Sequence, residues 1–269
     1  KAFKNKKFSC FINVHLNGNV ENINEIYKFC KKKKIKIIDD ACHALGTKYL
    51  LNRKMYNICD NSFCDISTLS FHPSKLITTG EGGALLTNNV GFYKKALTLM
   101  NHGYKKNLIR KSGFSHSYYK IFYPGYNFRL SDINCALGYS QIKRVKKKIY
   151  HRRKIAAFYD TYFRKSKIFD TVPIKKNVKS AYHLYPLLIR KLEKLNKIQL
   201  MYNLKKKKIF TQIHYLPLNK HPLYKSKDKN FSGSIKYFER SFSIPLHENI
   251  SLIDAKKIAN IIENESSKI

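Results

Sequence analysis

The sequence predicts an α/β protein whose mostly parallel sheet is flanked by helices and followed by a smaller α+β domain. The first half alternates apolar segments of strand length with a segment of helical period, whereas the second half has fewer and more widely spaced elements. Of the 269 residues, 43% are hydrophobic, which is enough for a sizeable core. We expect two domains, 1–150 and 151–269.

The elements of the first half follow from local patterns. A helix is expected over 21–34, because apolar residues recur there at helical spacing: Ile23, Ile26, Tyr27 and Cys30. Short apolar runs predict strands at 8–14, 35–39, 65–71 and 84–88, and a second helix is expected at 90–101. Strands that alternate with helices indicate a largely parallel sheet.

The rest of the chain begins with a stretch, 103–127, that is rich in Tyr, Lys and Gly and lacks a clear period. We interpret it as a long ordered loop, and loops of that length are usually functional. Ser131 then caps a long helix over 131–163. Its apolar stripe comprises Ile133, Ala136, Leu137 and Ile142. Later elements are expected as strand 181–189, helix 195–208, strand 209–218 and helix 251–264.

The net charge of +36 has two interpretations. One is a basic surface for nucleic acid. The other is an ordinary globular protein of Lys-rich composition, because the lysine runs 31–34 and 205–208 each close a predicted helix, where cations complement the helix dipole. We favour the second interpretation and expect no specific nucleic-acid partner. The basic field would still gather an anionic small molecule.

The location of the protein is also constrained. No run of eighteen apolar residues occurs, so no membrane span is predicted, and residues 1–14 lack the cleavage site of a secretory signal. All six cysteines lie in the first half without a C-x-x-C pair, which favours reduced thiols in the cytoplasm. No paired Cys/His motif accompanies Cys59 and Cys64, so no metal site is predicted.

Polar residues follow three of the predicted strands, where ligands gather in open α/β sheets. Asp39 and Asp40 leave an apolar strand, Ser70 ends the strand before Lys75, and a Gly-Glu-Gly-Gly turn follows at 80–83. Taken singly, such residues are also typical of helix caps, surfaces and turns.

Together they match the needs of pyridoxal phosphate. A carboxylate holds the pyridine nitrogen protonated, and a lysine about 35 residues later forms the Schiff base and shuttles the proton. A serine and backbone N–H groups can bind the phosphate. The glycines after Lys75 would set its turn and leave room for substrate.

Longer motifs make a family resemblance explicit. The chain carries, in order, IIDDACHALGTKY, SFHPSKLITTGEGGALLTN, NHG, GYNFRLSDINCALGYSQIKR, SAYHLYPL and QIHYLPL. It resembles the DegT/DnrJ/EryC1/StrS family of nucleotide-sugar aminotransferases, which are fold-type I pyridoxal phosphate enzymes. Its HPSK-ITTGEGG and DACHALG motifs are most similar to the branch that aminates C4 of a UDP-linked 4-keto-6-deoxy-N-acetylhexosamine in pseudaminic acid synthesis.

The resemblance implies roles for single residues. Lys75 would be the Schiff-base lysine and Asp40 the partner of the pyridine nitrogen. His43 would neighbour the cofactor ring and its O3′, and Ser70 would bind the phosphate. Asn127 would reach the phosphate of a neighbouring subunit, which implies a homodimer with shared active sites, although a turn role for Asn127 stays open. Residues implied on the sugar-nucleotide side are Arg129, His183, His214 and Tyr215, whose types also suit core or interface positions.

The implied reaction is a transamination from glutamate to the C4 ketone of a UDP-linked keto sugar. Lys75 is present, whereas dehydrating members of the family carry histidine at that position. Glutamate and UDP come from the resemblance alone. Amination at C3, or of a dTDP- or GDP-sugar, therefore stays open, as does an inactive remnant or basic binding protein.

Members of the family carry roughly one hundred further residues before the strand at 8–14. The resemblance therefore makes 1–150 the C-terminal portion of the large cofactor-binding domain and 151–269 the small C-terminal domain. It also implies that this chain is a fragment, a split product or a remnant, so activity of the 269 residues alone is an open expectation.

Overall fold

The computed structural model describes residues 7–104, 120–224 and 231–269. Two compact units are present. The first comprises Lys1–Val145 and Asn177–Lys179, and the second comprises Lys146–Lys176 and Ser180–Ile269. The chain first passes between them at Val145, and the expected domains 1–150 and 151–269 stay a prediction.

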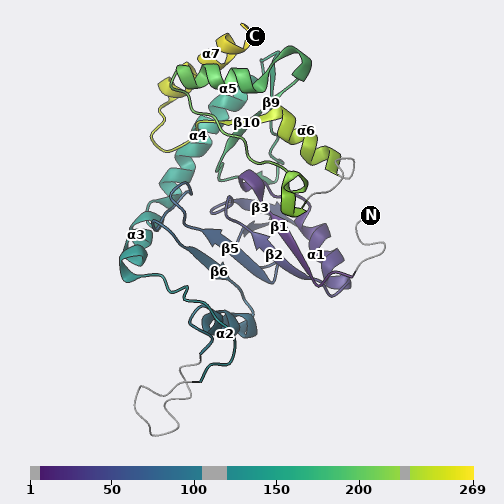
Figure 1. The fold of residues 1–269 in the computed structure, drawn as a ribbon, viewed down its shortest axis with the longest axis vertical. Helices are drawn as coiled ribbons and strands as arrows, with labels where there is room; N and C mark the ends of the chain where they lie inside the picture. The colour runs from purple at the N-terminus through teal and green to yellow at the C-terminus, as the bar shows by residue number, and fades with distance from the viewer. Residues whose placement is uncertain (1–6, 105–119, 225–230) are drawn as a thin grey trace. The chain divides into compact units, whose positions relative to one another are not determined.

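The first unit contains a four-stranded sheet in the order β1-β2-β5-β6 (Figure 1). Its strands are β1 (Cys10–Val14), β2 (Lys36–Asp40), β5 (Ile66–Ser70) and β6 (Gly83–Leu86). β1, β2 and β5 are parallel, and β6 runs antiparallel to β5. All four lie where strands were expected, and the α/β fold class with a mostly parallel sheet is confirmed.

Two helices of this unit also lie where they were expected. They are α1 (Ile23–Lys32) and α2 (Val90–Leu99). α1 buries Cys30, which packs with Ile35 and Ile37. Its last turn carries Lys31 and Lys32, so the first lysine run does lie at a helix C-terminus.

A second sheet of the first unit was not predicted. It contains β3 (Lys48–Leu51), β4 (Lys54–Asn57) and β8 (Val178–Lys179), in the order β4-β3-β8. β3 and β4 form a hairpin whose turn residues, Asn52 and Arg53, both have positive φ, at 47° and 62°. This hairpin lacks the glycine that usually marks such a turn in a sequence.

The helix expected over 131–163 is interrupted. It consists of α3 (Asp132–Ile142) and α4 (Val145–Phe163). Ser131 caps α3 as predicted, because its Oγ accepts the N–H of Asn134 at 3.3 Å. The expectation of one continuous helix was wrong.

The interruption is a tight turn in which the N–H of Arg144 bonds to the carbonyl of Gln141 at 3.1 Å. The two helices have different surroundings. α4 contributes side chains to the core of the second unit: Ile155, Ala156, Tyr159 and Phe163. α3 buries none of its residues, and Ile133 of the predicted stripe is 84% exposed.

The second unit is an α+β arrangement around a three-stranded sheet in the order β10-β9-β7, with all pairs antiparallel. Its strands are β7 (Phe169–Thr171), β9 (Tyr185–Ile189) and β10 (Ser241–Ile244). Its helices are α5 (Lys197–Lys206), α6 (Ser232–Arg240) and α7 (Leu252–Ser266). Shorter 3-10 turns in the chain are η1 (Leu16–Gly18), η3 (Leu192–Lys194), η4 (Leu218–Lys220) and η5 (Pro222–Tyr224).

The strand expected at 209–218 is not formed. Only Gln212 pairs there, through two hydrogen bonds with Ser243 of 3.1 and 2.7 Å. Ile209 is buried in the hydrophobic core of the second unit, so the apolar pattern reflects side-chain packing rather than a strand ladder. Of the loop expected at 103–127, residues 105–119 lie outside the described ranges. Within those ranges, no helix has the length and apolar character needed to cross a bilayer.

Candidate active site

The carboxyl ends of β2 and β5 bring Asp40 and Ser70 to one edge of the sheet. Asp40 pairs in register with Thr68, and the next N–H, from Ala41, donates to the Thr68 carbonyl at 3.0 Å. The Asp40 carboxylate accepts the N–H of Cys42 at 3.1 Å. Asp40 is only partly buried, so its carboxylate can also meet a ligand. This edge is where ligands bind in open α/β sheets.

Lys75 and Asp40 both shift the pKa of the Cys42 thiol. The pKa of this thiol is raised to about 11, mainly by burial, and the hydrogen bond and charge of Asp40 add to the rise. The positive charge of Lys75 opposes it. The ammonium and the carboxylate therefore lie close enough for their fields to reach one sulfur. The thiol stays protonated at neutral pH.

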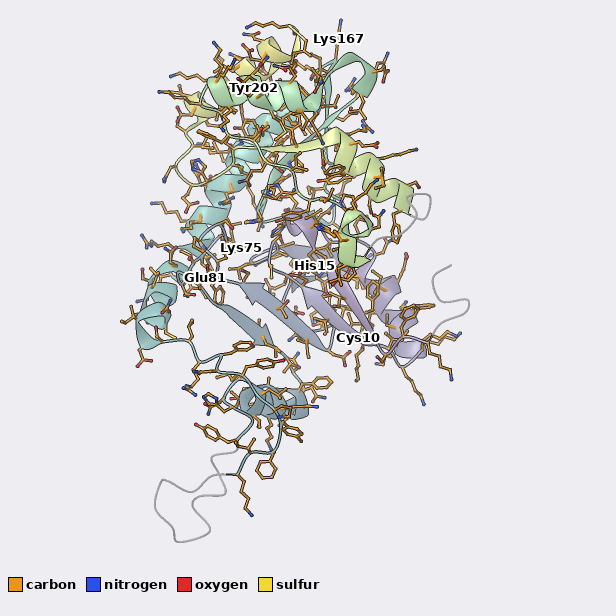
Figure 2. The ribbon with its side chains drawn as sticks, in the orientation of Figure 1. Cys10, His15, Lys75, Glu81, Lys167 and Tyr202 are labelled. Carbon is orange, nitrogen blue, oxygen red and sulfur yellow. The ribbon has the colours of Figure 1, made fainter. Side chains whose placement is uncertain are left out.

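Lys75 lies in a closed loop, 71–82, between β5 and β6 (Figure 2). The N–H of Phe71 donates to the carbonyl of Gly82 at 2.8 Å, and the N–H of Thr79 donates to the carbonyl of Phe71 at 3.0 Å. Asn134 of α3 holds the same loop by donating to the Thr79 carbonyl. These bonds fix the loop at its base, and Lys75 itself is half-buried.

The glycines of this loop are required by its backbone. Gly80 and Gly82 have φ values of 82° and 149°, which side chains rarely adopt. A Cβ on Gly82 would also lie 2.5 Å from Thr79 Oγ1, which donates to the Glu81 carbonyl. These glycines therefore form the turn around Lys75, and the room they would leave for substrate stays a prediction.

Replacement of Gly82 tests the importance of this turn. Gly82→Ala is expected to cost about 1–3 kcal/mol of folding free energy, because the new Cβ has neither space nor a favourable φ. Denaturant unfolding of the whole chain measures it. Gly233→Ala in α6 is the matched control, since no atom lies within 4 Å of its Cβ position. Equal stability of both variants would contradict the prediction.

His43 and Ser70 have hydrogen bonds that suit their predicted roles. The buried His43 ring accepts the N–H of Asn17 on Nδ1 at 3.5 Å, which places the proton of the neutral ring on Nε2. Ser70 Oγ accepts the N–H of His72 at 3.3 Å, so its hydroxyl hydrogen can be donated. The Nε2–H of His43 would thus suit an anionic oxygen on a ring, and the hydroxyl of Ser70 would suit a phosphate.

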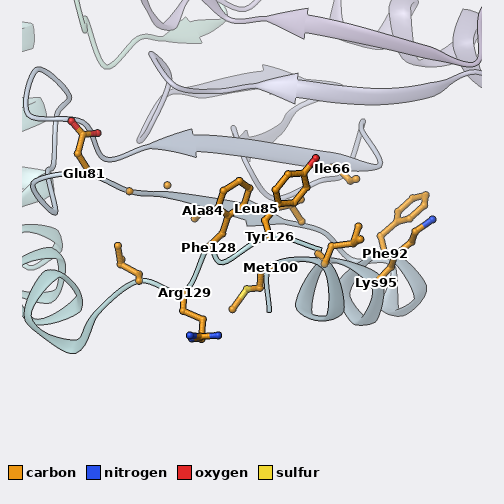
Figure 3. Close-up of a pocket in the computed structure, with 15 residues that line it drawn as sticks. Ile66, Glu81, Ala84, Leu85, Phe92, Lys95, Met100, Tyr126, Phe128 and Arg129 are labelled. Atoms are coloured by element: carbon orange, nitrogen blue, oxygen red, sulfur yellow. The ribbon is translucent and has the colours of Figure 1, made fainter. Parts of the chain in front are cut away.

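Asn127 and Arg129 lie on the segment that runs beside α2. Asn127 is exposed and forms an isolated bridge with Asn101, whose side chain also accepts a hydrogen bond from Arg129. Arg129 borders an apolar cavity of about 740 Å³ (Figure 3). Most of the cavity lining comes from β6, α2 and residues 126–130, rather than from Asp40 or Lys75.

His183, His214 and Tyr215 belong to the second unit. The carbonyl of His183 accepts a hydrogen bond of 3.1 Å from the buried Arg152 guanidinium. His214 is buried, and its Nδ1 lies 2.9 Å from Ser243 Oγ. Tyr215 is 54% exposed, and its ring meets that of His214 edge-on. Their roles toward a substrate stay predictions.

Two further residues at the sheet edge, Asn13 and His15, were missed by the sequence analysis. Asn13 lies near the end of β1, His15 directly follows that strand, and both contact Asp39. The signal available was a histidine directly after an apolar strand that runs beside the strand of Asp40. Among the described residues, no three His, Cys, Asp or Glu side chains gather closely enough to hold a metal ion.

Comparison with known proteins places these residues in a family. Residues 3–263 match the DegT/DnrJ/EryC1/StrS aminotransferase family. The chain is 35% identical over 258 residues to the UDP-4-amino-4,6-dideoxy-N-acetyl-beta-L-altrosamine transaminase of Campylobacter jejuni, covering 95% of this chain and 65% of that protein.

Solved structures agree. Helicobacter pylori PseC, an aminotransferase involved in the biosynthesis of pseudoaminic acid, is 30% identical with a TM-score of 0.83, over 96% of this chain and 67% of that one. The PMP-form of the putative sugar aminotransferase Spr1654 from Streptococcus pneumoniae is 26% identical with a TM-score of 0.86. The match covers 97% of this chain and 70% of that one. This chain thus spans about two thirds of the length of these relatives, and it belongs to the DegT/DnrJ/EryC1/StrS aminotransferase family.

Proposed function

We propose that this chain takes part in the pyridoxal phosphate-dependent transfer of an amino group from glutamate to the C4 ketone of a UDP-linked 4-keto-6-deoxy-N-acetylhexosamine. The observation that carries the proposal is that Asp40 ends β2 and that Lys75 lies in the loop directly after the neighbouring parallel strand β5, in a member of an aminotransferase family. The C4 position and the UDP carrier are supported by the name of the C. jejuni relative.

The residues at the sheet edge fit pyridoxal phosphate. The Asp40 carboxylate suits a protonated pyridine nitrogen, and the half-buried Lys75 amine suits the aldehyde. His43 Nε2–H and the Ser70 hydroxyl suit the ring oxygen and the phosphate. When bound, the cofactor supplies an electron sink for the carbanion at the amino-acid Cα. Lys75 removes the Cα proton of glutamate and delivers a proton to the carbon that carries the new amine.

Further parts of the proposal concern the substrate and assembly. Arg129, His183, His214 and Tyr215 contact the sugar nucleotide. Asn127 reaches the phosphate in a neighbouring subunit, so the active protein is a homodimer with shared sites. The net charge of +36 helps to gather the anionic substrate. The six free cysteines suit a reducing cytoplasm.

Visible absorbance tests the proposal. The chain mixed with pyridoxal phosphate is expected to give a band that depends on Lys75 and bleaches when glutamate is added. A UDP-4-keto sugar should then restore the band and yield the 4-amino product, detected by mass spectrometry. Absence of both the band and its bleaching would overturn the proposal.

The carrier and the rival binding role are tested in parallel. Matched 4-keto and 3-keto sugars on dTDP and GDP are offered in the same assay, and faster turnover of one of them would reassign the substrate. Binding to arbitrary DNA is measured as salt rises. A nucleic-acid binder loses affinity steeply with salt, so tight salt-dependent binding without turnover would favour a basic binding protein.

A further inference from the structure

His15 is a buried side chain that the proposed reaction does not use. It follows β1 directly and is 1% exposed. Its Nε2 lies 3.2 Å from Asp39 Oδ2, and its backbone N–H donates to the carbonyl of Asp40 at 3.1 Å. One residue therefore contacts both aspartates at the end of the neighbouring strand.

The contacts continue along both segments. Asn13 Nδ2 donates to Asp39 Oδ1 at 3.2 Å, and the N–H of Asn17 donates to His43 Nδ1 at 3.5 Å. Farther on, Thr47 Oγ1 donates to the Gly18 carbonyl at 3.3 Å. Residues 13–18 thus make a series of contacts with residues 39–47. That stretch includes the two predicted cofactor residues Asp40 and His43.

The buried carboxylate of Asp39 requires polar partners. It is 3% exposed, and a buried carboxylate is costly unless it is paired and hydrogen-bonded. Asn13 provides a hydrogen bond to one carboxylate oxygen, and the His15 ring lies at ion-pair distance from the other. Successive side chains of a strand point to opposite faces, so holding Asp39 on one face sets the direction of Asp40 on the other.

We propose that His15 is a positioning residue that aims the Asp40 carboxylate at the pyridoxal phosphate site. The ring fixes Asp39, and the backbone N–H fixes Asp40. This inference rests on the proposed function for the identity of the ligand, but the positioning itself is a property of the cofactor-free chain.

Amide hydrogen exchange tests the positioning without cofactor. The N–H of Cys42 bonds to the Asp40 carboxylate, so its exchange rate reports whether that carboxylate is held. His15→Leu should speed exchange at Cys42 at least about tenfold. His15→Gln, which keeps a donor near the Nε2 position, should stay close to wild type.

The control is Cys30→Ala, which removes a buried side chain from the core packed around α1 in the same unit. If it speeds exchange at Cys42 as much as His15→Leu does, His15 acts only through general stability and the proposal fails. Should His15→Leu not fold, the double variant His15→Leu, Asp39→Leu removes both polar partners together. Fast exchange at Cys42 in the folded double variant supports the proposal, and wild-type exchange overturns it.

Pyridoxal phosphate affinity is the second readout. His15→Leu should weaken binding about tenfold or more, and His15→Gln should restore it. If the wild type does not bind pyridoxal phosphate, the proposed function fails while the exchange result still decides the positioning role. If exchange at Cys42 is faster in His15→Leu but the affinity for pyridoxal phosphate is unchanged, His15 does not position Asp40 for this cofactor.

Discussion

Lys75→Ala is expected to abolish transamination together with the visible band that depends on the lysine. Under the proposed function, the half-buried Lys75 in the loop 71–82 is both covalent anchor and proton carrier. Loss of both roles should lower the rate about 10⁴-fold or more. Single-turnover reaction with glutamate, followed by absorbance, measures this loss.

The control for Lys75 is Lys94→Ala, which removes an exposed lysine from α2 of the same unit. It should keep the wild-type rate, because the chain holds many exposed lysines whose charge alone does not support catalysis. Added methylamine should restore part of the rate of Lys75→Ala, since a diffusible amine can carry the proton. A Lys75→Ala variant with wild-type turnover would refute the assignment.

Asp40→Asn should have the second largest effect. The amide has nearly the shape of the carboxylate but no charge, so it cannot hold the pyridine nitrogen protonated. Removing one preorganised electrostatic group of this kind costs about 10²–10³-fold in rate. We expect the variant to fold and to bind pyridoxal phosphate, with a slow reaction with glutamate in single turnover.

The same substitution at Asp132, an acidic residue in the first turn of α3, is the control for Asp40. Asp132→Asn removes an exposed negative charge from the same unit and should leave the rate unchanged. Equal rates for Asp40→Asn and wild type would show that the pyridine nitrogen has another partner. A fall in rate for both variants would instead indicate a general effect of net charge.

The elements most accurately predicted were those with a strong local pattern. β1, β2, β5 and β6 are apolar runs between polar residues, and the spacing of Ile23 and Cys30 marked α1. The β3–β4 hairpin was missed because Asn52 and Arg53 form its turn without glycine. The break between α3 and α4 carries neither proline nor glycine, so no local signal marked it.

The candidate site was predicted to the extent that its motifs are local. Asp40 and Ser70 are the last residues of two strands, Lys75 lies in a glycine-bounded turn, and the structure brings all three to one edge of the sheet. The part played by His15 depends on the pairing of Val14 with Asp40, a register that two distant segments acquire only in the folded sheet. Periodicity likewise predicted an apolar stripe on α3, but it cannot tell what covers that stripe.

The short strand β8 affects how the protein folds as it is made. Its residues Val178 and Lys179 pair with Tyr49 and Lys48 of the first unit, yet they are translated after the first segment of the second unit. A nascent chain that has emerged only as far as Val145 therefore leaves one side of β3 without this partner. Because domains tend to fold as they leave the ribosome, the first unit must wait for part of the second before its own sheet is complete. The order of synthesis thereby couples the maturation of the two units.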